Sequence, residues 1–473
     1  MTKGGEFRKY YGNTINLIDW SKDARLFYRK SKVGRLIPEY LWYLNGITWS
    51  KIASKGSSFR YLQSECTFDE VNITFNNEKF IPLFLSFLNS KVPFEIFKIF
   101  NPTFSLQTEN VLELPITDVL LQNYTNELFI SQIEISRLDW DSRETSWDFQ
   151  ENELIRRQVA TIEEAYQMWL SDWTKQFKQL HANEVKLNRL FIDIYGLQDE
   201  LTPEVKLKDI TILQEELDYG ALGEATEPEQ LPNPDALPVK QAEVVGQLLS
   251  YIVGCAMGRY RLDRPGLHIA YPNPSREEIE AYVYNGKPFR IDDDAIIPLM
   301  DAACGFPDNA LNLIKNCIEQ IWGESALIAN LNFIDTALGK DLETYLQKDF
   351  WKEHCRRYQK RPIYWLFSSP TGAFRAITYM HRMNRFTVEK IRSAYLLKYI
   401  QNLENRRVVL EAGVAALDKQ KQRTLEKIRH DLAECREYDL LLKDVADRQI
   451  EFDLDDGVVV NYAKFAGVVG EIK

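Results

Sequence analysis

The stretch Gln359–Arg385, QKRPIYWLFSSPTGAFRAITYMHRMNR, sets the expected fold of the C-terminal half. Its apolar run Ile363–Phe367 is rich in β-branched and aromatic residues, which predicts a short buried strand. Ser368–Gly372 follows as a turn, because proline fixes one φ angle and glycine tolerates a positive φ.

A helical pattern is predicted after this turn. Phe374, Ile377 and the pair Met380–His381 recur at helical spacing, which leaves the opposite face to arginines. These arginines are Arg375, Arg382 and Arg385. A buried strand leading into a basic helix would present positive charge from a rigid support. A core strand followed by an ordinary solvated helix explains the same pattern, and both interpretations stay open.

Composition points to a folded protein of two or three domains, with 473 residues, 45% hydrophobic and 12% aromatic residues. The six cysteines are scattered and none forms a CxxC pair, which is typical of a reducing compartment and gives no zinc ribbon. The sequence has no apolar run of about 20 residues, the length needed to cross a bilayer. We therefore expect a soluble cytoplasmic protein with no membrane partner.

The net charge of −11 is unevenly distributed along the chain. Residues 1–65 contain 12 Lys or Arg against 5 Asp or Glu, and residues 348–407 contain 14 against 4. Two basic segments on an acidic chain favour a localised polyanion site, which we expect on one concave face. Two unrelated solvated surfaces are the alternative.

Hydrophobic periodicity predicts an α+β protein with four regions. We expect a mixed α/β domain over residues 1–135, a helical spacer over 136–213, an acidic linker over 214–238, and a mainly helical domain over 239–473. An amphipathic helix over residues 155–194 dominates the spacer, with Ile162, Tyr166, Trp169, Trp173, Phe177, Leu180, Leu187 and Phe191 on one stripe.

Several shorter elements are also predicted. Residues 80–100 indicate two short helices punctuated by proline, and Val111–Ile116 and Val458–Asn461 indicate strands. Residues 403–442 have the heptad-like spacing of a helical hairpin, in which Val414 and Leu417 are expected at the interface. Val244–Tyr260 indicates a buried helix whose Gly254 and Gly258, four residues apart on one face, permit close packing.

The sequence offers no catalytic, cofactor-binding or metal-binding constellation. Asn101–Phe104, NPTF, is similar to the NPPY-type tetrad of amino-methyltransferases, but it lacks the second proline and the tyrosine and is interpreted as a turn. His354 and Cys355 would need further converging ligands to hold a metal. Whether the chain is an enzyme stays uncertain.

Several motifs together resemble one family. They are KGGEFRKYYGN at Lys3–Asn13, GITWSKIASKGSSFRY at Gly46–Tyr61, SYIVGCAMGRYRLD at Ser250–Asp263, YQKRPIYWLFSS at Tyr358–Ser369, and DLDDGVVVNYAKF at Asp453–Phe465. The chain resembles BREX-type adenine-specific DNA methyltransferases, the PglX family, which are related to fused type II restriction-modification enzymes.

The resemblance implies a division of labour. In this family the glycine-rich cofactor motif and the NPPY tetrad precede the KGGEFRKYYGN stretch, so we expect this chain to be the C-terminal target-recognition half. It should recognise double-stranded DNA for adenine N6 methylation and phage defence, and should not bind S-adenosylmethionine or transfer methyl groups by itself. The expected partners are the methyltransferase half and other phage-defence components. The alternative is a protein-interaction scaffold without sequence readout.

We expect DNA contacts from two sets of residues. Phosphate contacts are predicted for Lys3, Arg8, Lys9, Arg382 and Arg385, and base contacts for Ser50, Ser57, Arg60 and Tyr61 in the loop around Trp49–Tyr61. Tyr10, Trp49, Lys360 and Arg361 complete the predicted DNA-binding set. For Arg60, an ion pair with a local acid such as Glu65 is the alternative.

Overall fold

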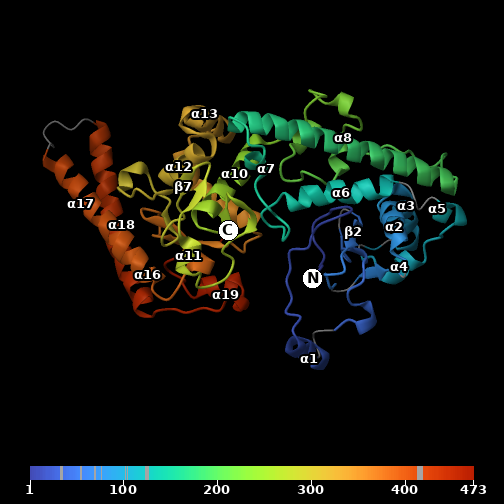
Figure 1. The fold of residues 1–473 in the computed structure, drawn as a ribbon, viewed down its shortest axis with the longest axis horizontal. Helices are drawn as coiled ribbons and strands as arrows, with labels where there is room; N and C mark the ends of the chain where they lie inside the picture. Colours follow the sequence, from blue (N-terminus) through green and yellow to red (C-terminus); the bar gives the residue numbers. More distant parts are fainter. Residues whose placement is uncertain are drawn as a thin grey trace. The chain divides into compact units, whose positions relative to one another are not determined.

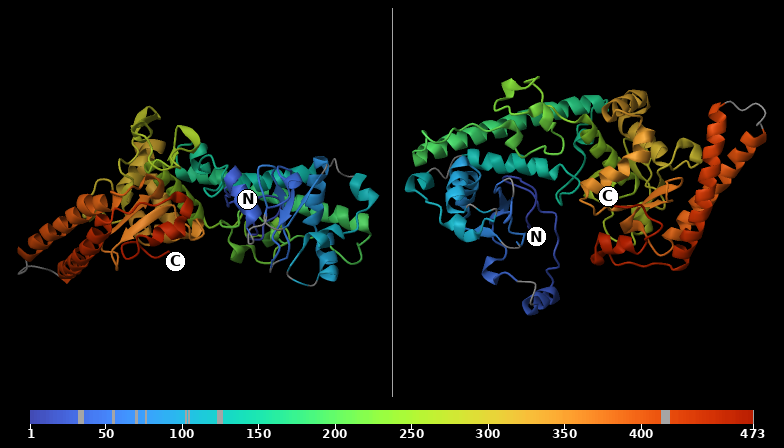
Figure 2. Two further views of the ribbon diagram at one scale, coloured as in Figure 1. Left: turned by 90° about the horizontal axis from the view of Figure 1, so that it is seen from below. Right: turned by 180° about the vertical axis from the view of Figure 1, so that it is seen from behind.

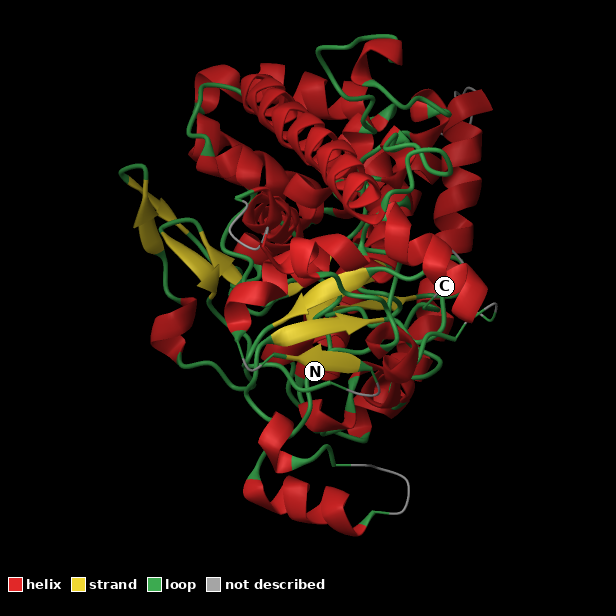
Figure 3. Ribbon diagram, turned by 90° about the vertical axis from the view of Figure 1, so that its right-hand side faces the viewer, coloured by secondary structure: helices red, strands yellow, loops and turns green. Residues whose placement is uncertain are grey.

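The structure, a computed structural model, describes residues 1–31, 36–53, 56–68, 71–75, 77–101, 103, 105–122, 127–412 and 419–472. The chain forms two compact units (Figure 1). Unit 1 comprises Met1–Phe149 and Gln167–Lys240, and unit 2 comprises Gln150–Tyr166 and Gln241–Lys473. Helices surround small antiparallel sheets (Figure 3), which confirms the predicted α+β class.

Unit 1 is built on a three-stranded antiparallel sheet in the order β2-β1-β3, with β1 (Gly46–Trp49) between β2 (Phe59–Leu62) and β3 (Asn72–Thr74). Its short helices are α1 (Lys22–Lys30), η1 (Glu39–Leu41), η2 (Glu78–Phe80), α2 (Ile81–Leu88), α3 (Lys91–Phe100), α4 (Thr108–Leu112), α5 (Asp118–Gln122), η3 (Leu207–Asp209), α9 (Tyr219–Leu222) and η4 (Pro228–Gln230). The two short helices expected in residues 80–100 are thus confirmed.

The strand expected at Val111–Ile116 is wrong, because this segment begins inside helix α4. Gln107 and Asn110 form a capping box that satisfies the first amide groups of the helix. Val111 is the buried residue of α4, so one apolar contact suffices to dock it. Of the preceding turn Asn101–Phe104, Pro102 and Phe104 lie outside the described residues.

Two long helices support unit 1. Helix α8 (Ile162–Tyr195) runs beside α6 (Leu128–Asp141) in Figure 1, and Asn183 Nδ2 donates to Gln132 Oε1 at 3.3 Å. Every residue of the predicted stripe is buried, which confirms the amphipathic helix from Ile162 on. The start expected at residue 155 is wrong, because residues 153–156 form the separate helix α7 and residues 157–161 are not helical. Phe191 on this stripe packs against Phe87 and Phe129, with ring centroids 5.3 and 6.2 Å apart. The first turns of α8 belong to unit 2 and the remainder to unit 1.

The acidic segment 214–238 is anchored to unit 1 by buried leucines, although most of its residues are exposed. Leu217, Leu222, Leu231 and Leu237 are buried, and Leu237 N donates to Thr174 Oγ1 on α8 at 3.2 Å. The segment therefore completes unit 1, which ends at Lys240. The segment is rich in acidic residues, but the leucines between them determine how it packs.

The core of unit 2 is the sheet β8-β10-β9, formed by β8 (Ile296–Pro298), β9 (Tyr364–Ser368) and β10 (Arg375–Tyr379). The predicted strand is confirmed as β9, but the helix expected after the turn is a strand. Gly372, with φ 87°, allows the tight turn, and β10 then pairs antiparallel to β9 with Ile377 opposite Leu366. Ile377, Thr378 and Tyr379 favour a strand, and this pairing prevails over the helical spacing.

Helices and two small hairpins surround this sheet. They are α7 (Glu153–Arg156), α10 (Gln241–Ala256), β4 (Tyr260–Arg261), β5 (Arg264–Leu267), α11 (Arg276–Ile279), β6 (Tyr282–Tyr284), β7 (Lys287–Phe289), η5 (Ala302–Cys304), α12 (Ala310–Trp322), η6 (Glu324–Ala326), α13 (Leu327–Leu338), α14 (Leu342–Lys348), α15 (Phe350–Arg357), η7 (Met380–Arg382), α16 (Thr387–Lys390), η8 (Ile391–Leu396), η10 (Leu454–Asp456) and α19 (Val458–Ala463). The strand expected at Val458–Asn461 is therefore wrong. Gly457, with φ 81°, caps a helix there instead.

The predicted helical hairpin is confirmed as α17 (Leu397–Ala412) and α18 (Lys419–Asp447), which lie side by side in Figure 2. Leu403, Ile428, Cys435 and Leu442 are buried at their interface positions. Val414 and Leu417 lie outside the described residues.

Within the described ranges, no single helix is both long and apolar enough to cross a membrane. Gly254 plays the expected packing role in α10, because a Cβ there would lie 2.6 Å from Cδ2 of Tyr260. The helix expected to reach Tyr260 ends at Ala256, and Gly258, with φ 79°, lies in the turn before β4 and not on the helix face.

Candidate nucleic-acid interface

The KGGEFRKYYGN stretch is threaded into unit 1 as an internal strand-like segment. Tyr10 N donates to Phe59 O at 2.8 Å, and Tyr61 N donates to Tyr10 O at 2.8 Å, which ties the segment to β2. On its other side Lys9 N donates to Thr211 Oγ1 at 3.0 Å. Because the backbone is held on both sides there, Arg8, Tyr10 and Tyr11 are buried among neighbouring parts of unit 1, whereas residues 3–6 are exposed.

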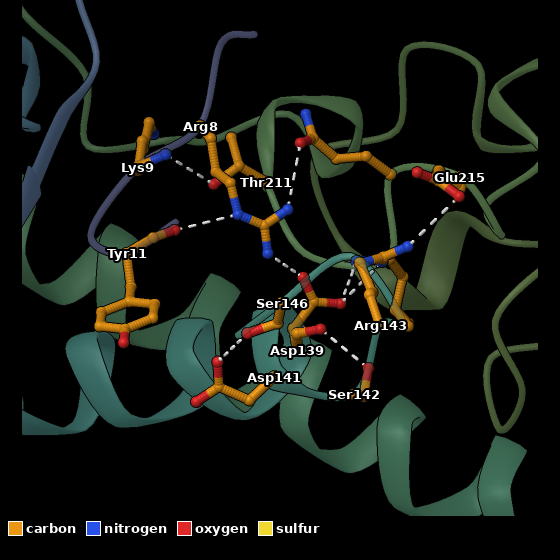
Figure 4. Close-up of polar contacts among 12 residues, drawn as sticks. Arg8, Lys9, Tyr11, Asp139, Asp141, Ser142, Arg143, Ser146, Thr211 and Glu215 are labelled. Atoms are coloured by element: carbon orange, nitrogen blue, oxygen red, sulfur yellow. Dashed lines mark hydrogen bonds and ion pairs between the residues drawn. The ribbon is translucent and has the colours of Figure 1, made fainter. Parts of the chain in front are cut away.

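Arg8 is buried in an ionic network, shown in Figure 4. Its guanidinium pairs with Asp139 on α6, donates through Nε to Tyr11 O at 3.0 Å, and lies 5.1 Å from the ring of Trp140. The phosphate contact predicted for Arg8 is therefore wrong, since only 4% of the residue is exposed. Its charge serves to fasten the N-terminal segment to α6.

Asp139 is the carboxylate at which the cations Arg8 and Arg143 of this network meet. Arg143 lies 3.1 Å from Asp139 Oδ1 and also pairs with Glu216 at 2.9 Å, while Leu213 N donates to Asp139 Oδ1 at 2.8 Å. Burial by itself would raise the pKa of Asp139, but Arg143, Arg8 and the Leu213 amide together hold that pKa below its ordinary value. The carboxylate is thus ionised and fully paired inside unit 1.

Lys9 and Tyr10 are also engaged internally. Lys9 Nζ lies 2.6 Å from Glu184 on α8, and Tyr10 is fully buried. Burial and the Glu184 carboxylate raise the pKa of Tyr10 well above its ordinary value, so the phenol stays neutral. Neither side chain is available to DNA in this structure, and both predicted contacts are corrected.

Much of the predicted base-reading loop forms the core of the sheet. Trp49 is buried and its Nε1 donates to Leu106 O at 3.0 Å, while buried Ser50 accepts a hydrogen bond from Gly5 N at 3.1 Å. Both predictions are wrong because β1 is the central strand. Ser57 and Tyr61 are half-buried, and the base contacts predicted for them stay predictions. Residues 54 and 55 of the loop lie outside the described residues.

Arg60 is only 1% exposed, so the predicted base contact is wrong for this conformation. No carboxylate pairs with it among the described residues, Glu65 included. Its guanidinium donates to Ser58 O and to Ser50 Oγ, both at the long distance of 3.5 Å. Burial, followed by the nearby charge of Arg8, lowers the pKa of Arg60 to about 10. Arg60 is a buried cation with weak neutral partners.

In unit 2, Arg382 is a structural clamp. Its guanidinium donates to Met257 O at 3.2 Å, Asp292 O at 2.6 Å and Asp293 O at 2.9 Å. These bonds join the end of β10 to the end of α10 and to the segment before β8. Arg382 is half-buried, so its predicted phosphate contact stays a prediction.

The remaining predicted cations are exposed. Lys3 lies on the surface of unit 1, and Lys360 and Arg361 lie on the surface of unit 2. Arg385 is half-exposed, with Glu451 at 3.5 Å and the ring of Phe386 at 4.9 Å. Exposed pairs of this kind contribute little to stability, so Arg385 can exchange its partner for a phosphate. These four contacts stay predictions.

The other concentration of exposed cations in unit 1 is α1. It carries Lys22, Arg25, Arg29 and Lys30 against a single acid, Asp23. Its basic and aromatic interleaving is visible in the sequence, but the sequence does not tell whether these aromatics are core residues.

No group of three or more His, Cys, Asp or Glu side chains in the described ranges could hold a metal ion. His354 is buried and its Nε2 accepts a hydrogen bond from Tyr364 N at 3.1 Å. Burial, and then the charges of Arg357 and Arg259, lower the pKa of His354 well below its ordinary value. A neutral, hydrogen-bonded core histidine accounts for this residue.

Comparison with known proteins matches the chain to two curated methyltransferases, while no family model matches it. The chain is 34% identical to the adenine-specific methyltransferase PglX of Lacticaseibacillus casei (strain Zhang), over 98% of this chain and 38% of that protein. It is 33% identical to the adenine-specific methyltransferase BrxX of Escherichia coli O9:H4 (strain HS), over 100% of this chain and 40% of that protein. The resemblance inferred from the motifs is therefore confirmed, and the chain spans about two-fifths of the length of these relatives.

Proposed function

We propose that this chain, related along its length to about two-fifths of two adenine-specific methyltransferases, recognises duplex DNA for adenine N6 methylation in a BREX phage-defence or restriction-modification system. S-adenosylmethionine binding and methyl transfer then belong to the part of these relatives that the chain does not match. The observation that carries the proposal is the match, at 33–34% identity over 98–100% of the chain, to proteins named adenine-specific methyltransferases.

The charge distribution supports a DNA contact on unit 1. Residues 1–65 are basic on a chain with a net charge of −11, and a surface field follows local rather than total charge. With Arg8, Lys9 and Arg60 taken up inside the fold, exposed cations such as Lys3 and those of α1 remain for phosphates. Such contacts give affinity without sequence information, so base readout must come from side chains beside them.

The alternative function is a scaffold that joins proteins of a phage-defence complex in the cytoplasm without reading DNA. The extended helical surface of α17 and α18 suits such a role. A scaffold has no need of duplex affinity, whereas recognition requires it, so the two functions separate in one binding experiment.

The test is fluorescence anisotropy of the chain with a labelled duplex pool over a range of salt concentrations, followed by selection of bound sequences. Recognition predicts that log K falls linearly with log salt, by about 0.9 per phosphate contact, and that selection converges on a motif. Absence of duplex binding at low salt, together with capture of defence proteins, would establish the scaffold instead.

A second experiment tests whether the chain directs methyl transfer by the part of the relatives that it does not match. The chain is combined with the unmatched part of a relative, and N6-methyladenine is mapped in plasmid DNA. Methylation should occur at the selected motif only when both parts are present. Methylation by this chain alone would overturn the division of labour.

A further inference from the structure

Helix α1 has no buried residue, although it is nine residues long and rich in apolar and aromatic side chains. Phe27 is 68% exposed and Leu26 is 43% exposed. An isolated helix shorter than about 12 residues is marginal in water, and most helical stability in proteins comes from packing one face. A helix with exposed aromatics and no packed face is built for an external partner.

The contacts that hold α1 are few and lie near its ends. Ser21 Oγ accepts a hydrogen bond from Ala24 N at 3.2 Å, which caps the first turn. Arg25 lies 5.5 Å from the ring of Trp42, and Arg29 pairs with Glu39, where both side chains are at least half exposed. Such contacts orient the helix while leaving its outer face open.

The cations of α1 fall on one basic arc. At about 100° per residue, Lys22, Arg25, Arg29 and Lys30 lie within about 140°, together with Leu26. Arg25 and Arg29 occupy the side of this arc that contacts Trp42 and Glu39, Lys22 and Lys30 lie toward its other side, and Phe27 follows about 60° beyond Lys30. No ion-pair partner of Lys22 or Lys30 lies among the described residues. Helix α1 thus carries four cations against one acid, Asp23.

Two tryptophans next to α1, Trp20 and Trp42, hold the N-terminal end of the helix in place. Trp20, next to the helix cap, packs edge-on against Trp42 with ring centroids 5.1 Å apart, and its Nε1 donates to Tyr43 Oη at 3.0 Å. Trp42 Nε1 in turn donates to Ile37 O at 2.9 Å. The two indoles thus form an anchored platform under the helix.

We propose that α1 is the element of unit 1 that enters the major groove of duplex DNA. With its side chains an α-helix is about 10–12 Å across, which fits a major groove about 12 Å wide. Lys22, Arg29 and Lys30 contact phosphates on the groove walls, and Phe27 lies against base edges, where an aromatic ring meets a thymine methyl group. This inference rests on the proposed DNA recognition and names the element that performs it.

The ratio of cations to exposed apolar side chains on α1 favours DNA over other partners. Two exposed apolar side chains are too few to bury a helix in a lipid surface on their own, whereas four cations on one arc match the regular negative charge of a duplex. An acidic protein surface would satisfy the cations but would leave no distinct use for Phe27 at the centre of the helix.

The first test is hydrogen exchange of the peptide covering residues 21–31, with and without the selected duplex. The amides of α1 should exchange rapidly in the free chain and become protected on binding, whereas the buried amides of α8 should not change. Protection by phosphatidylglycerol vesicles but not by DNA would overturn the inference in favour of a membrane-surface helix.

The second test uses matched charge removal. The double variant Lys22→Ala, Lys30→Ala should lower the salt slope by about two and weaken duplex binding. The control, Lys175→Ala with Lys186→Ala, removes the same charge from exposed positions of α8 and should leave both unchanged. Phe27→Ala should reduce the preference for the selected motif over a scrambled duplex more than it reduces overall binding.

The outcomes separate this inference from the proposed function. Specific DNA binding that survives the α1 variants as well as the control refutes the role of α1 and leaves recognition standing. No duplex binding by the unaltered chain refutes both. Since α1 buries no residue, the variants should unfold at the same temperature as the unaltered chain, which excludes a folding defect as the cause of lost binding.

Discussion

Arg8 and Asp139, 131 residues apart in the chain, form an ion pair in the interior of unit 1, where the Asp139 side chain has no exposed surface. The pair joins the N-terminal segment to α6. From the sequence, Arg8 is predicted to contact a phosphate, so its substitution should weaken DNA binding. Because Arg8 is buried in this ion pair, its substitution should instead lower the stability of unit 1.

Arg8→Met should destabilise unit 1 by about 3 kcal/mol, because it leaves the buried Asp139 carboxylate with Arg143 as its remaining cationic partner. Urea denaturation measures the change. The control Lys3→Ala removes an exposed charge from the same segment and should change stability by less than about 0.5 kcal/mol. Equal midpoints for the two variants would contradict the structural role of the pair.

Arg60→Met should leave stability unchanged or raise it by about 1–2 kcal/mol, because it replaces a buried cation without a carboxylate partner by an apolar side chain of similar length. The same urea experiment applies. A large loss of stability would show that the long hydrogen bonds to Ser50 and Ser58 outweigh the cost of burial. The preference for a selected DNA motif should not change, since Arg60 does not reach the surface.

Unit 2 should lose stability as pH falls below about 6.5 because of His354. The lowered pKa keeps this histidine neutral in the folded state, while the unfolded chain gains a proton near its ordinary pKa, so acid favours unfolding. The loss should approach about 1.4 kcal/mol per pH unit between pH 6.5 and the folded-state pKa.

The contribution of His354 is isolated by comparing unfolding free energies at pH 7.5 and 5.0 in the unaltered chain and in His354→Gln. The amide oxygen of glutamine can still accept from Tyr364 N but does not titrate. The variant should therefore lose less stability between the two pH values. An equal loss would assign the pH dependence to other groups, among them His381, whose pKa burial lowers to about 4.

Gly254→Ala should destabilise unit 2 by about 1–3 kcal/mol through overpacking. A Cβ at this position would lie 2.6 Å from Cδ2 of Tyr260 and 3.1 Å from Oη of Tyr364, both on buried rings. Thermal unfolding provides the measurement. Gly4→Ala is the matched control, because its nearest neighbour would lie 3.6 Å away, and it should have an unchanged midpoint.

Local pattern in the sequence was sufficient for much of the framework. The stripe from Ile162 to Phe191 predicts α8, the run Ile363–Phe367 predicts β9, and heptad spacing predicts the hairpin of α17 and α18. These features depend on side-chain periodicity within one element, which the order of residues records directly. The motifs that indicate the family are likewise contiguous.

The sequence by itself determined which residues carry charge, and only the tertiary structure decided where that charge goes. Arg8 meets Asp139 and Arg382 meets Met257 across 131 and 125 residues, and Arg60 is enclosed because β2 pairs with β1 on one side and with the segment at Tyr10 on the other. By contrast, Phe27 of α1 is 68% exposed, although nothing in the sequence distinguishes it from a core aromatic. Burial and ion pairing depend on contacts between distant segments, and no local pattern of residues encodes which distant segment will meet it.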